Sequence, residues 1–372
     1  MKINRTVPAP ALLLLPFILL LVSPQKMAVG AESPRLHRSA PALGRGNTGY
    51  SAPEADDALF QNPAAIHRGS SGEDPLEVKR IILLSPLLSF SGSANELMDI
   101  GSDDVKLLKA MRQLSGDPVH LGLDQYSGVR FGESAVGLIY TNRYNLFIFK
   151  DPENAGVETV DLTGVSSTGL VVGHGIRLPS VGLRLGAMLK ALQRKDSRAL
   201  LSIAQVDAIK NFNLGQYESK GQGYGADVGL VWRPDTTFGL RLGLVVQDVG
   251  DTTYKGNETD GVALLPDRQT VNAGLSFQLP GPTGSMRLHL DMRDILGRQD
   301  DDVYKRLHTG ATWQTLEYLG VSAGLNQGYF TAGLLLRLPW FRMDLGTYGE
   351  EMGASSGDRP SRRYFIRLTG FL

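Results

Sequence analysis

The 372-residue sequence contains no cysteine. Disulfide-stapled scaffolds, thiolate zinc centres, cysteine nucleophiles and lipid-modified cysteines are therefore excluded. Lysine plus arginine number 38, as do aspartate plus glutamate, so the formal net charge is zero. Proteins that bind nucleic acid usually carry a basic excess, and no basic run is present, so we expect no nucleic-acid partner.

Long apolar runs are also scarce. The most pronounced, residues 11–22, follows Lys2 and Arg5 and precedes the small residues Val29, Gly30 and Ala31. About a dozen apolar residues are too few to cross a bilayer as a helix, whereas this order of features is typical of a secretory signal peptide. We predict a signal peptide over residues 1–31, cut after Ala31; a membrane anchor is the less favoured alternative.

The sequence does contain long stretches of strict alternation. Between Gly221 and Gly250, two arms of about ten residues flank a turn signal at Pro234 and Asp235, and every second residue of each arm is apolar. A period of two indicates extended strands, because successive side chains point to opposite faces. The second face carries glycine, arginine, aspartate and glutamine, and this combination is typical of a membrane-spanning β-barrel.

An apolar run at Val78–Phe90 could form a strand, and from Val119 to Leu372 the chain continues strand after strand. Unpaired sheet edges are excluded within lipid, so the sheet must close, and single-chain bacterial barrels have even strand numbers. We predict an all-β fold: a closed antiparallel transmembrane barrel of about 14 strands over residues 76–372, within a range of about 14 to 16. One small amphipathic helix is expected within Ser93–Ser115, and residues 190–220 are ambiguous between strand, helix and loop.

Polar side chains on the glycine-bearing face are expected to line the lumen. They are Asp227, Arg241, Arg287, His289, Asp291, Arg293, His308, Arg337, Arg342, Asp344 and Arg367. Charges of both signs favour a salt-bridge network that braces a water-containing lumen. A solute-selective lining and a catalytic site that combines His289 with Asp291 or His308 are the alternatives. The chain has no GxSxG or HExxH motif, and no carboxylate with calcium-loop spacing follows Asp302, so we expect no enzyme, metal or cofactor.

Residues 32–75 are rich in proline, glycine, serine and alanine and show no lasting period. We predict that they form an N-terminal hatch, or partial plug, with a disordered leader as the alternative. Asn62, Pro63 and Ala64 form a turn signal in this segment. The Asn62 side chain can bond backbone groups of the loop and hold the hatch shut; a purely structural turn is equally open.

Several motifs together resemble the FadL-like superfamily of outer-membrane barrels, and most closely its PorV/PorQ and TraF-like (conjugal transfer) branches. They are NPAAI at Asn62–Ile66, GYGADVGLVWRP at Gly223–Pro234, LRLGLVVQDVGDTTY at Leu240–Tyr254 and the stretch Gly310–Leu338. The resemblance spans roughly residues 50–372 and implies a barrel with an N-terminal hatch. One departure is the terminal pair Phe371-Leu372, where such barrels often end in phenylalanine or tryptophan.

The resemblance implies two functions. The first is passive passage of small hydrophobic compounds across the outer membrane, gated by the hatch or by a kink in a neighbouring strand. The alternative is a non-catalytic partner of a protein secretion or conjugal transfer system. The expected partners are outer-membrane lipid, hydrophobic small molecules and secretion or conjugation proteins.

Overall fold

A computed structural model describes residues 35–66, 80–94, 109, 112–150, 157–202, 214–236, 238–259, 261–280, 284–300 and 302–372. The predicted signal peptide lies outside the described residues. So do both ends of the predicted hatch and most of the predicted helix within Ser93–Ser115. None of the described helices is long and apolar enough to cross a membrane.

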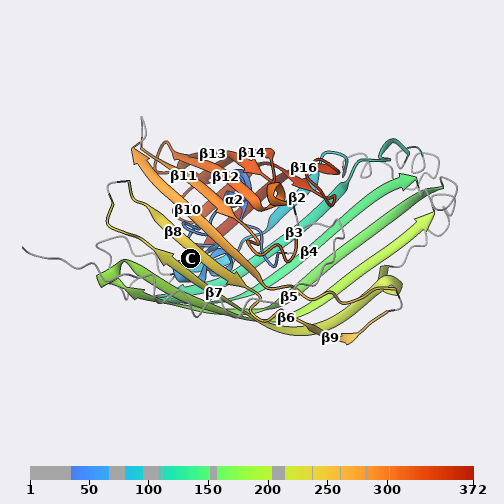
Figure 1. The fold of residues 1–372 in the computed structure, drawn as a ribbon, viewed down its shortest axis with the longest axis horizontal. Coiled ribbons are helices and arrows are strands. Elements are labelled where there is room, and N and C mark those ends of the chain that lie inside the picture. The colour runs from blue at the N-terminus through green and yellow to red at the C-terminus, as the bar shows by residue number, and fades with distance from the viewer. Residues whose placement is uncertain are drawn as a thin grey trace, which may run out of the picture.

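The described chain is dominated by strands (Figure 1). The strands are β1 (Arg80–Leu84), β2 (Leu87–Ser91), β3 (Val119–Phe131), β4 (Ser134–Lys150), β5 (Glu158–Leu178), β6 (Leu183–Ser202), β7 (Glu218–Trp232), β8 (Arg241–Gln247), β9 (Tyr254–Asn257), β10 (Thr270–Pro280), β11 (Ser285–Met292), β12 (Leu307–Gln314), β13 (Leu319–Asn326), β14 (Tyr329–Arg337), β15 (Phe341–Glu351) and β16 (Pro360–Phe371). The short helices are α2 (Ala40–Gly44), α3 (Ala58–Gln61), η2 (Pro63–Ala65), η3 (Pro179–Val181), η4 (Leu214–Tyr217) and α7 (Val303–Arg306).

These strands form one 16-stranded sheet that closes on itself. β1 and β2 each pair with both β3 and β16, so they are two halves of one wall strand, interrupted at Ser85 and Pro86. β9 is a short addition that pairs with β7 outside the wall. Counting β1 and β2 together and setting β9 aside, the 16 strands give a wall of 14. The predicted closed antiparallel barrel is confirmed, and the ambiguous residues 190–220 supply the end of β6 and the start of β7.

The two faces of the wall differ as the alternation predicts. Outward residues are apolar and exposed, such as Leu138 at 63% and Leu189 at 64% relative exposure. Inward residues of the same strands are buried, including Ile139 and Lys190. An exposed apolar surface of this extent needs an apolar surrounding.

The two ends of the barrel also differ. At one end strands join through short turns, such as Gly132-Glu133 and Leu338–Trp340, and the strand pairing brings Ile81 against Leu372. This short-turn end lies on the left of Figure 1. At the other end β4, β5 and β6 run on for up to 21 residues, well beyond the 9–11 that a membrane-spanning strand needs. The short turns of outer-membrane barrels face the periplasm.

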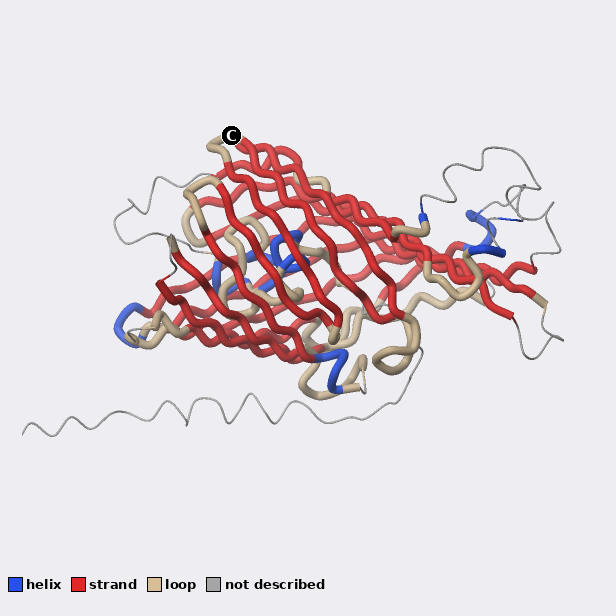
Figure 2. The backbone as a smooth tube through the Cα atoms, turned by 90° about the horizontal axis from the view of Figure 1, so that it is seen from above, coloured by secondary structure: helices blue, strands red, loops and turns tan. Residues whose placement is uncertain are grey.

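Residues 35–66, called the inner segment below, lie inside the barrel (Figure 2). α2 contacts β13, β14, β15 and β16, whereas η2 contacts β5, β6 and β7. The inner segment therefore crosses the lumen between opposite walls.

Candidate functional site

The turn at Asn62 joins the inner segment to the barrel wall. The Asn62 side chain is fully buried, and its Oδ1 accepts a hydrogen bond of 3.1 Å from the backbone N–H of Ala64, which caps η2. Its Nδ2 donates to the carbonyl of Tyr50, at 2.7 Å, and to that of Leu230 in β7, at 3.1 Å. One amide group thus satisfies backbone atoms of two inner-segment turns and one wall strand.

Glycine on the inward face of the wall makes this approach possible. A Cβ atom on Gly229 would lie 2.1 Å from Asn62 Oδ1, and one on Gly310 would lie 2.0 Å from the carbonyl oxygen of Arg45. Such distances are far below van der Waals contact, so the inner segment rests directly on the wall at both places, through the Asn62 side chain at Gly229 and through its backbone at Gly310.

An acidic loop of the inner segment binds arginines of β14, β15 and β16. Glu54 lies 3.3 Å from Arg337 and 3.6 Å from Arg342. Asp57 accepts a hydrogen bond of 2.7 Å from Arg367 Nη1. Asp344 joins the two wall arginines, because it accepts from Arg342 at 2.9 Å and from Arg367 at 3.1 Å. These buried charges compensate one another, so removing one partner would leave the others uncompensated.

Asp57 is the most enclosed carboxylate of this loop. It also accepts hydrogen bonds from Ser39 Oγ, at 2.6 Å, and lies 3.1 Å from His37 Nε2. Burial opposes the charged form, but the Arg367 guanidinium and His37 outweigh it and hold the pKa of Asp57 well below its ordinary value. The carboxylate is therefore ionised in the folded protein at neutral pH.

Asp291 and His308 hold a second turn of the inner segment. They face each other in the register of β11 and β12. Asp291 Oδ2, however, accepts from the backbone N–H groups of Gly49, at 2.6 Å, and Tyr50, at 3.0 Å. His308 Nδ1 lies 3.2 Å from the carbonyl oxygen of Gly46. Asp291 and His308, either of which the alternative catalytic site would combine with His289, therefore bond to the backbone of the inner segment.

The other predicted lumen residues also lie on the inner side. Arg293 donates to Asn47 Oδ1 at 2.8 Å, and Asp227 accepts from Lys190 at 2.9 Å. Arg241 of β8 and His289 of β11 both lie opposite Ser276 of β10, and Arg287 of β11 lies opposite Gln278. All three are nearer the short-turn end. Among the described residues, no group of three or more histidine, aspartate or glutamate side chains could hold a metal ion.

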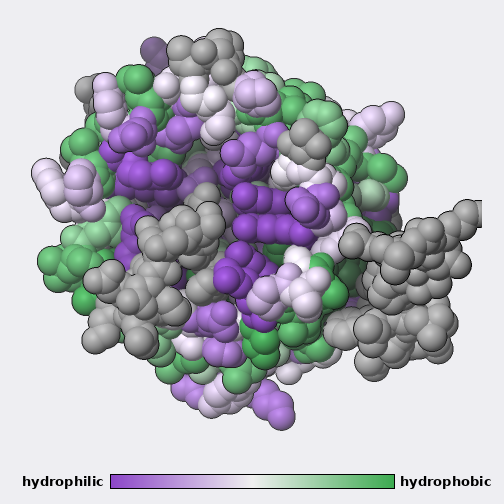
Figure 3. All heavy atoms as spheres, turned by 90° about the vertical axis from the view of Figure 1, so that its left-hand side faces the viewer, coloured by the Kyte–Doolittle hydropathy of each residue, from purple (hydrophilic) through white to green (hydrophobic). Residues whose placement is uncertain are grey.

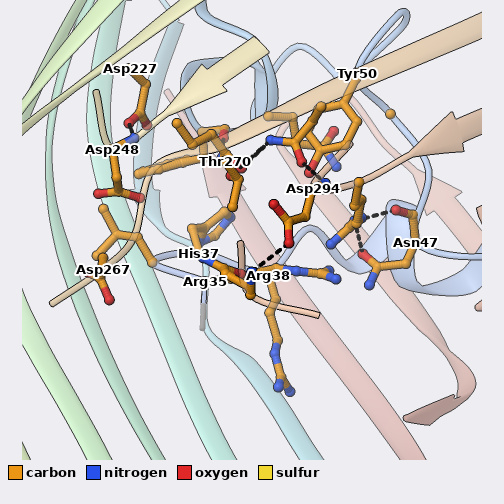
Figure 4. A pocket seen from close by; sticks show the side chains of 18 of the residues that line it. Arg35, His37, Arg38, Asn47, Tyr50, Asp227, Asp248, Asp267, Thr270 and Asp294 are labelled. Carbon is orange, nitrogen blue, oxygen red and sulfur yellow. Dashed lines mark hydrogen bonds between the residues drawn. The ribbon is translucent and has the colours of Figure 1, made fainter. Parts of the chain in front are cut away.

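A polar hollow lies beside the inner segment, between it and β6, β7, β8, β10, the loop after β11 and α7 (Figure 4). The space between atoms there is about 990 Å³, part of it open to solvent, and charged residues of both signs line it, including Arg38, Asp248 and Asp294. Burial raises the pKa of Asp248, in the loop after β8, to about 7, and Lys190, 2.6 Å away, opposes that rise. Such a hollow suits water and polar solutes better than apolar ones.

Comparison with known proteins identifies the family. The sequence model described as "F plasmid transfer operon, TraF, protein" matches residues 81–336, more than half of the chain. The chain belongs to this family. The TraF-like part of the predicted resemblance is thereby confirmed. No curated protein matches the sequence.

Two solved structures illustrate what the TraF-family chain is similar to. One is the toluene transporter TodX of Pseudomonas putida, with 11% identity, a TM-score of 0.47, and coverage of 93% of this chain and 99% of that one. The other is the CymD monoaromatic hydrocarbon channel, with 11% identity, a TM-score of 0.47, and coverage of 92% and 97%.

Sequence reasoning missed the inner-segment partners of the wall. Glu54, Asp56 and Asp57 were not among the predicted site residues, although each forms an ion pair with an arginine of the wall. One signal was present. The predicted lumen set holds six arginines against three aspartates, so carboxylates from outside the wall were required, and residues 54–57 are Glu-Ala-Asp-Asp.

Proposed function

We propose that the protein is an outer-membrane barrel that passes small hydrophobic compounds by diffusion, without catalysis. The observation that carries this proposal is an apolar stripe along one side of the lumen, the largest of the buried apolar clusters among the described residues. In it, side chains of the inner segment pack against inward residues of the wall. The stripe comprises Leu36, Leu59, Phe60, Ile66, Ile82, Tyr126, Ala135, Ile139, Val171, Met188, Leu192, Tyr254, Leu264 and Phe371. The exposed apolar outer surface supports the membrane location.

The stripe leads to the interruption in the first wall strand. Pro86 has no N–H to donate, and the ladder to β3 is paired only on either side of residues 83–86. Across this gap Ser127 Oγ donates to the carbonyl of Leu83 at 2.6 Å in place of a backbone donor. Tyr126 lies on the lumen side, its ring edge-on to Phe60 at 5.0 Å.

A crevice of about 320 Å³ runs along the same seam, lined by Leu59, Ile66, Ile82, Tyr126 and Ala135 together with polar groups. A hydrophobic compound that followed the stripe would therefore meet the gap in the backbone hydrogen bonds between residues 83–86 and β3. The inner segment covers this path, so passage requires it to shift. Asn62, Pro63 and Ala64, which anchor the segment to β5–β7, would set how readily it shifts.

A disulfide lock tests this mechanism, since the chain has no cysteine of its own. A Cβ atom on Gly173 would lie 2.3 Å from Leu59 Cδ1, so the double variant Leu59→Cys/Gly173→Cys places two thiols within reach. Entry of a small hydrophobic fluorophore into outer-membrane vesicles should fall at least about tenfold on oxidation and recover on reduction.

Each single cysteine variant, oxidised in the same way, serves as the control and should retain entry. Full entry through the locked barrel, with the disulfide verified by mass spectrometry, would refute passage past the inner segment.

A second candidate is a non-catalytic partner in conjugal transfer or secretion. The description of the family, which names a plasmid transfer operon, favours it. In that case a protein would co-purify with the barrel from its native membrane, and the locked variant would keep its biological activity.

A further inference from the structure

Inward arginines gather at the short-turn end of the barrel. Register with known inward neighbours places a guanidinium-bearing side chain on the lumen face of strand after strand. They are Arg80, Arg130, Arg177, Arg184, Arg233, Arg241, Arg287, Arg337 and Arg342. Figure 3 looks at this end: hydrophilic side chains surround a hollow, and hydrophobic atoms lie outside them.

Six of these arginines form three directly opposed pairs. Arg80 faces Arg130, Arg177 faces Arg184, and Arg337 faces Arg342 in the antiparallel register. Like charges directly opposite each other destabilise a sheet. Three such pairs at one end of the barrel indicate that the positive charge binds negatively charged groups there.

Two of the opposed arginine pairs show which groups this positive charge binds. Glu54 lies between Arg337 and Arg342, at 3.3 and 3.6 Å. Asp56 lies 3.3 Å from Arg80, and both line a crevice with Arg130. Each of these opposed pairs therefore receives a carboxylate from an acidic stretch of chain that lies inside the mouth of the barrel.

We propose that the third pair binds a carboxylate of another protein. In this proposal the short-turn mouth binds an acidic peptide segment of a partner, and a carboxylate of that segment lies on Arg177 and Arg184. Arg177 is exposed at the mouth, and Arg184 is buried beside it. Arg233 and Arg241 continue the same positive surface along β7 and β8.

The capacity of an arginine at this site supports the proposal. Arg342 contacts Glu54, Asp56 and Asp344 at once, within 3.6 Å. A guanidinium has five N–H donors in a planar fork that matches carboxylates, so an arginine with one partner can accept another.

An acidic peptide is favoured over a small free anion because the barrel already binds an acidic stretch of its own chain. Glu54 and Asp56 are two residues apart on one chain, and together they reach arginines of β1, β14 and β15. A chain that carries several carboxylates can span the arc of arginines from β3 to β11, which a single small anion cannot. This proposal does not depend on hydrophobic passage, and the two can fail separately.

Fluorescence anisotropy of the full chain in a neutral detergent tests the site. The probe is a fluorescein-labelled ten-residue peptide of alternating glutamate and glycine, and a lysine–glycine peptide is the reference. The acidic peptide should bind saturably and more weakly as salt rises, while the basic peptide should not bind. The variant Arg177→Gln/Arg184→Gln should weaken binding at least about tenfold.

The matched control is Arg198→Gln/Lys220→Gln, which removes the same charge from exposed side chains at the opposite end. It should leave binding within about twofold. Heat-modifiable migration in gels shows whether each variant is a folded barrel. Absence of saturable binding, or equal weakening by both double variants, would overturn the proposal. Displacement of the peptide by citrate at equally low concentration would show a small-anion site instead and would also overturn it.

Discussion

At the scale of single residues, Asn62 takes the place of backbone pairing where the inner segment meets the wall. Its three hydrogen bonds reach Tyr50, Ala64 and Leu230. Alanine would leave these buried groups without a donor or acceptor, at about 1–3 kcal/mol for each unsatisfied group. Opening of the inner segment would then cost less free energy.

We therefore expect Asn62→Ala to raise the rate of proteolytic cleavage within residues 35–66 by about tenfold or more, because a 1.4 kcal/mol loss is tenfold in an opening equilibrium. Asn257→Ala, on exposed β9, is the control and should cleave at the wild-type rate. Unchanged cleavage of the Asn62 variant, measured on folded barrel in detergent, would contradict the anchoring role.

The residue scale also shows what sequence can predict. Alternation places side chains on faces, so the inward positions of Arg342, Asp344 and Arg367 followed from the pattern. Their partners did not, because Asp56 and Asp57 lie in a segment without a period, and pairing across about 286 residues of chain is a tertiary event. Asn62 was identifiable because an Asn-Pro step has local turn chemistry.

At the scale of elements, α3 depends on the charge of the residue that precedes it. Asp57 makes no side-chain capping hydrogen bond to α3, and its carboxylate instead bonds Arg367, His37 and Ser39. The pKa of Asp57 is lowered in the folded state, so this bonding stabilises the fold fully above the unfolded value of about 3.9. The contribution is lost as the pH falls below that value towards the folded pKa.

We expect hydrogen-exchange protection of α3, corrected for intrinsic rates, to be constant from pH 7 to about pH 5 and to fall below about pH 4. Asp57→Asn should lower protection at pH 7 and remove the acid dependence. Asp302→Asn, which alters the exposed cap of α7, is the matched control and should leave α3 unchanged. Acid loss of protection that persists in Asp57→Asn would assign it to another group.

Strand boundaries also show what the sequence pattern does not predict. The apolar run Val78–Phe90 could form one strand by its pattern, and the structure divides its described part into β1 and β2 at Ser85 and Pro86. The signal was Pro86, which removes a ladder donor. The length of β5 was harder to predict from the sequence, because alternation continues beyond the part of a strand that spans the membrane. The alternation therefore does not show where the lipid ends.

At the scale of the whole molecule, the wall and the inner segment are separate structures. Among the described strands, the 14 wall strands form their ladders with one another and with β9, and no residue of 35–66 belongs to the sheet. The sequence predicted closure because edges are forbidden in lipid, independently of what fills the lumen. Filling of the lumen depends on contacts between inward glycines and the backbone of residues 35–66, which composition alone does not position.

This separation leads to a prediction about deletion of residues 35–66. The wall should still close, because its hydrogen bonds are internal, and planar-bilayer recordings should show a conductance that the intact chain lacks. The open pore should favour anions, since deletion removes Glu54, Asp56 and Asp57 from Arg342, Arg367 and Arg80 and leaves the inward arginines in excess. Loss of these pairs also leaves arginines of like charge close together on the lumen face, so the deleted barrel should unfold at lower denaturant than the intact one. Arg342→Gln/Arg367→Gln in the deleted chain should reduce anion preference and recover part of that stability. A cation-selective pore, or a folded deletion barrel that does not conduct, would show that something other than the inner segment closes the lumen.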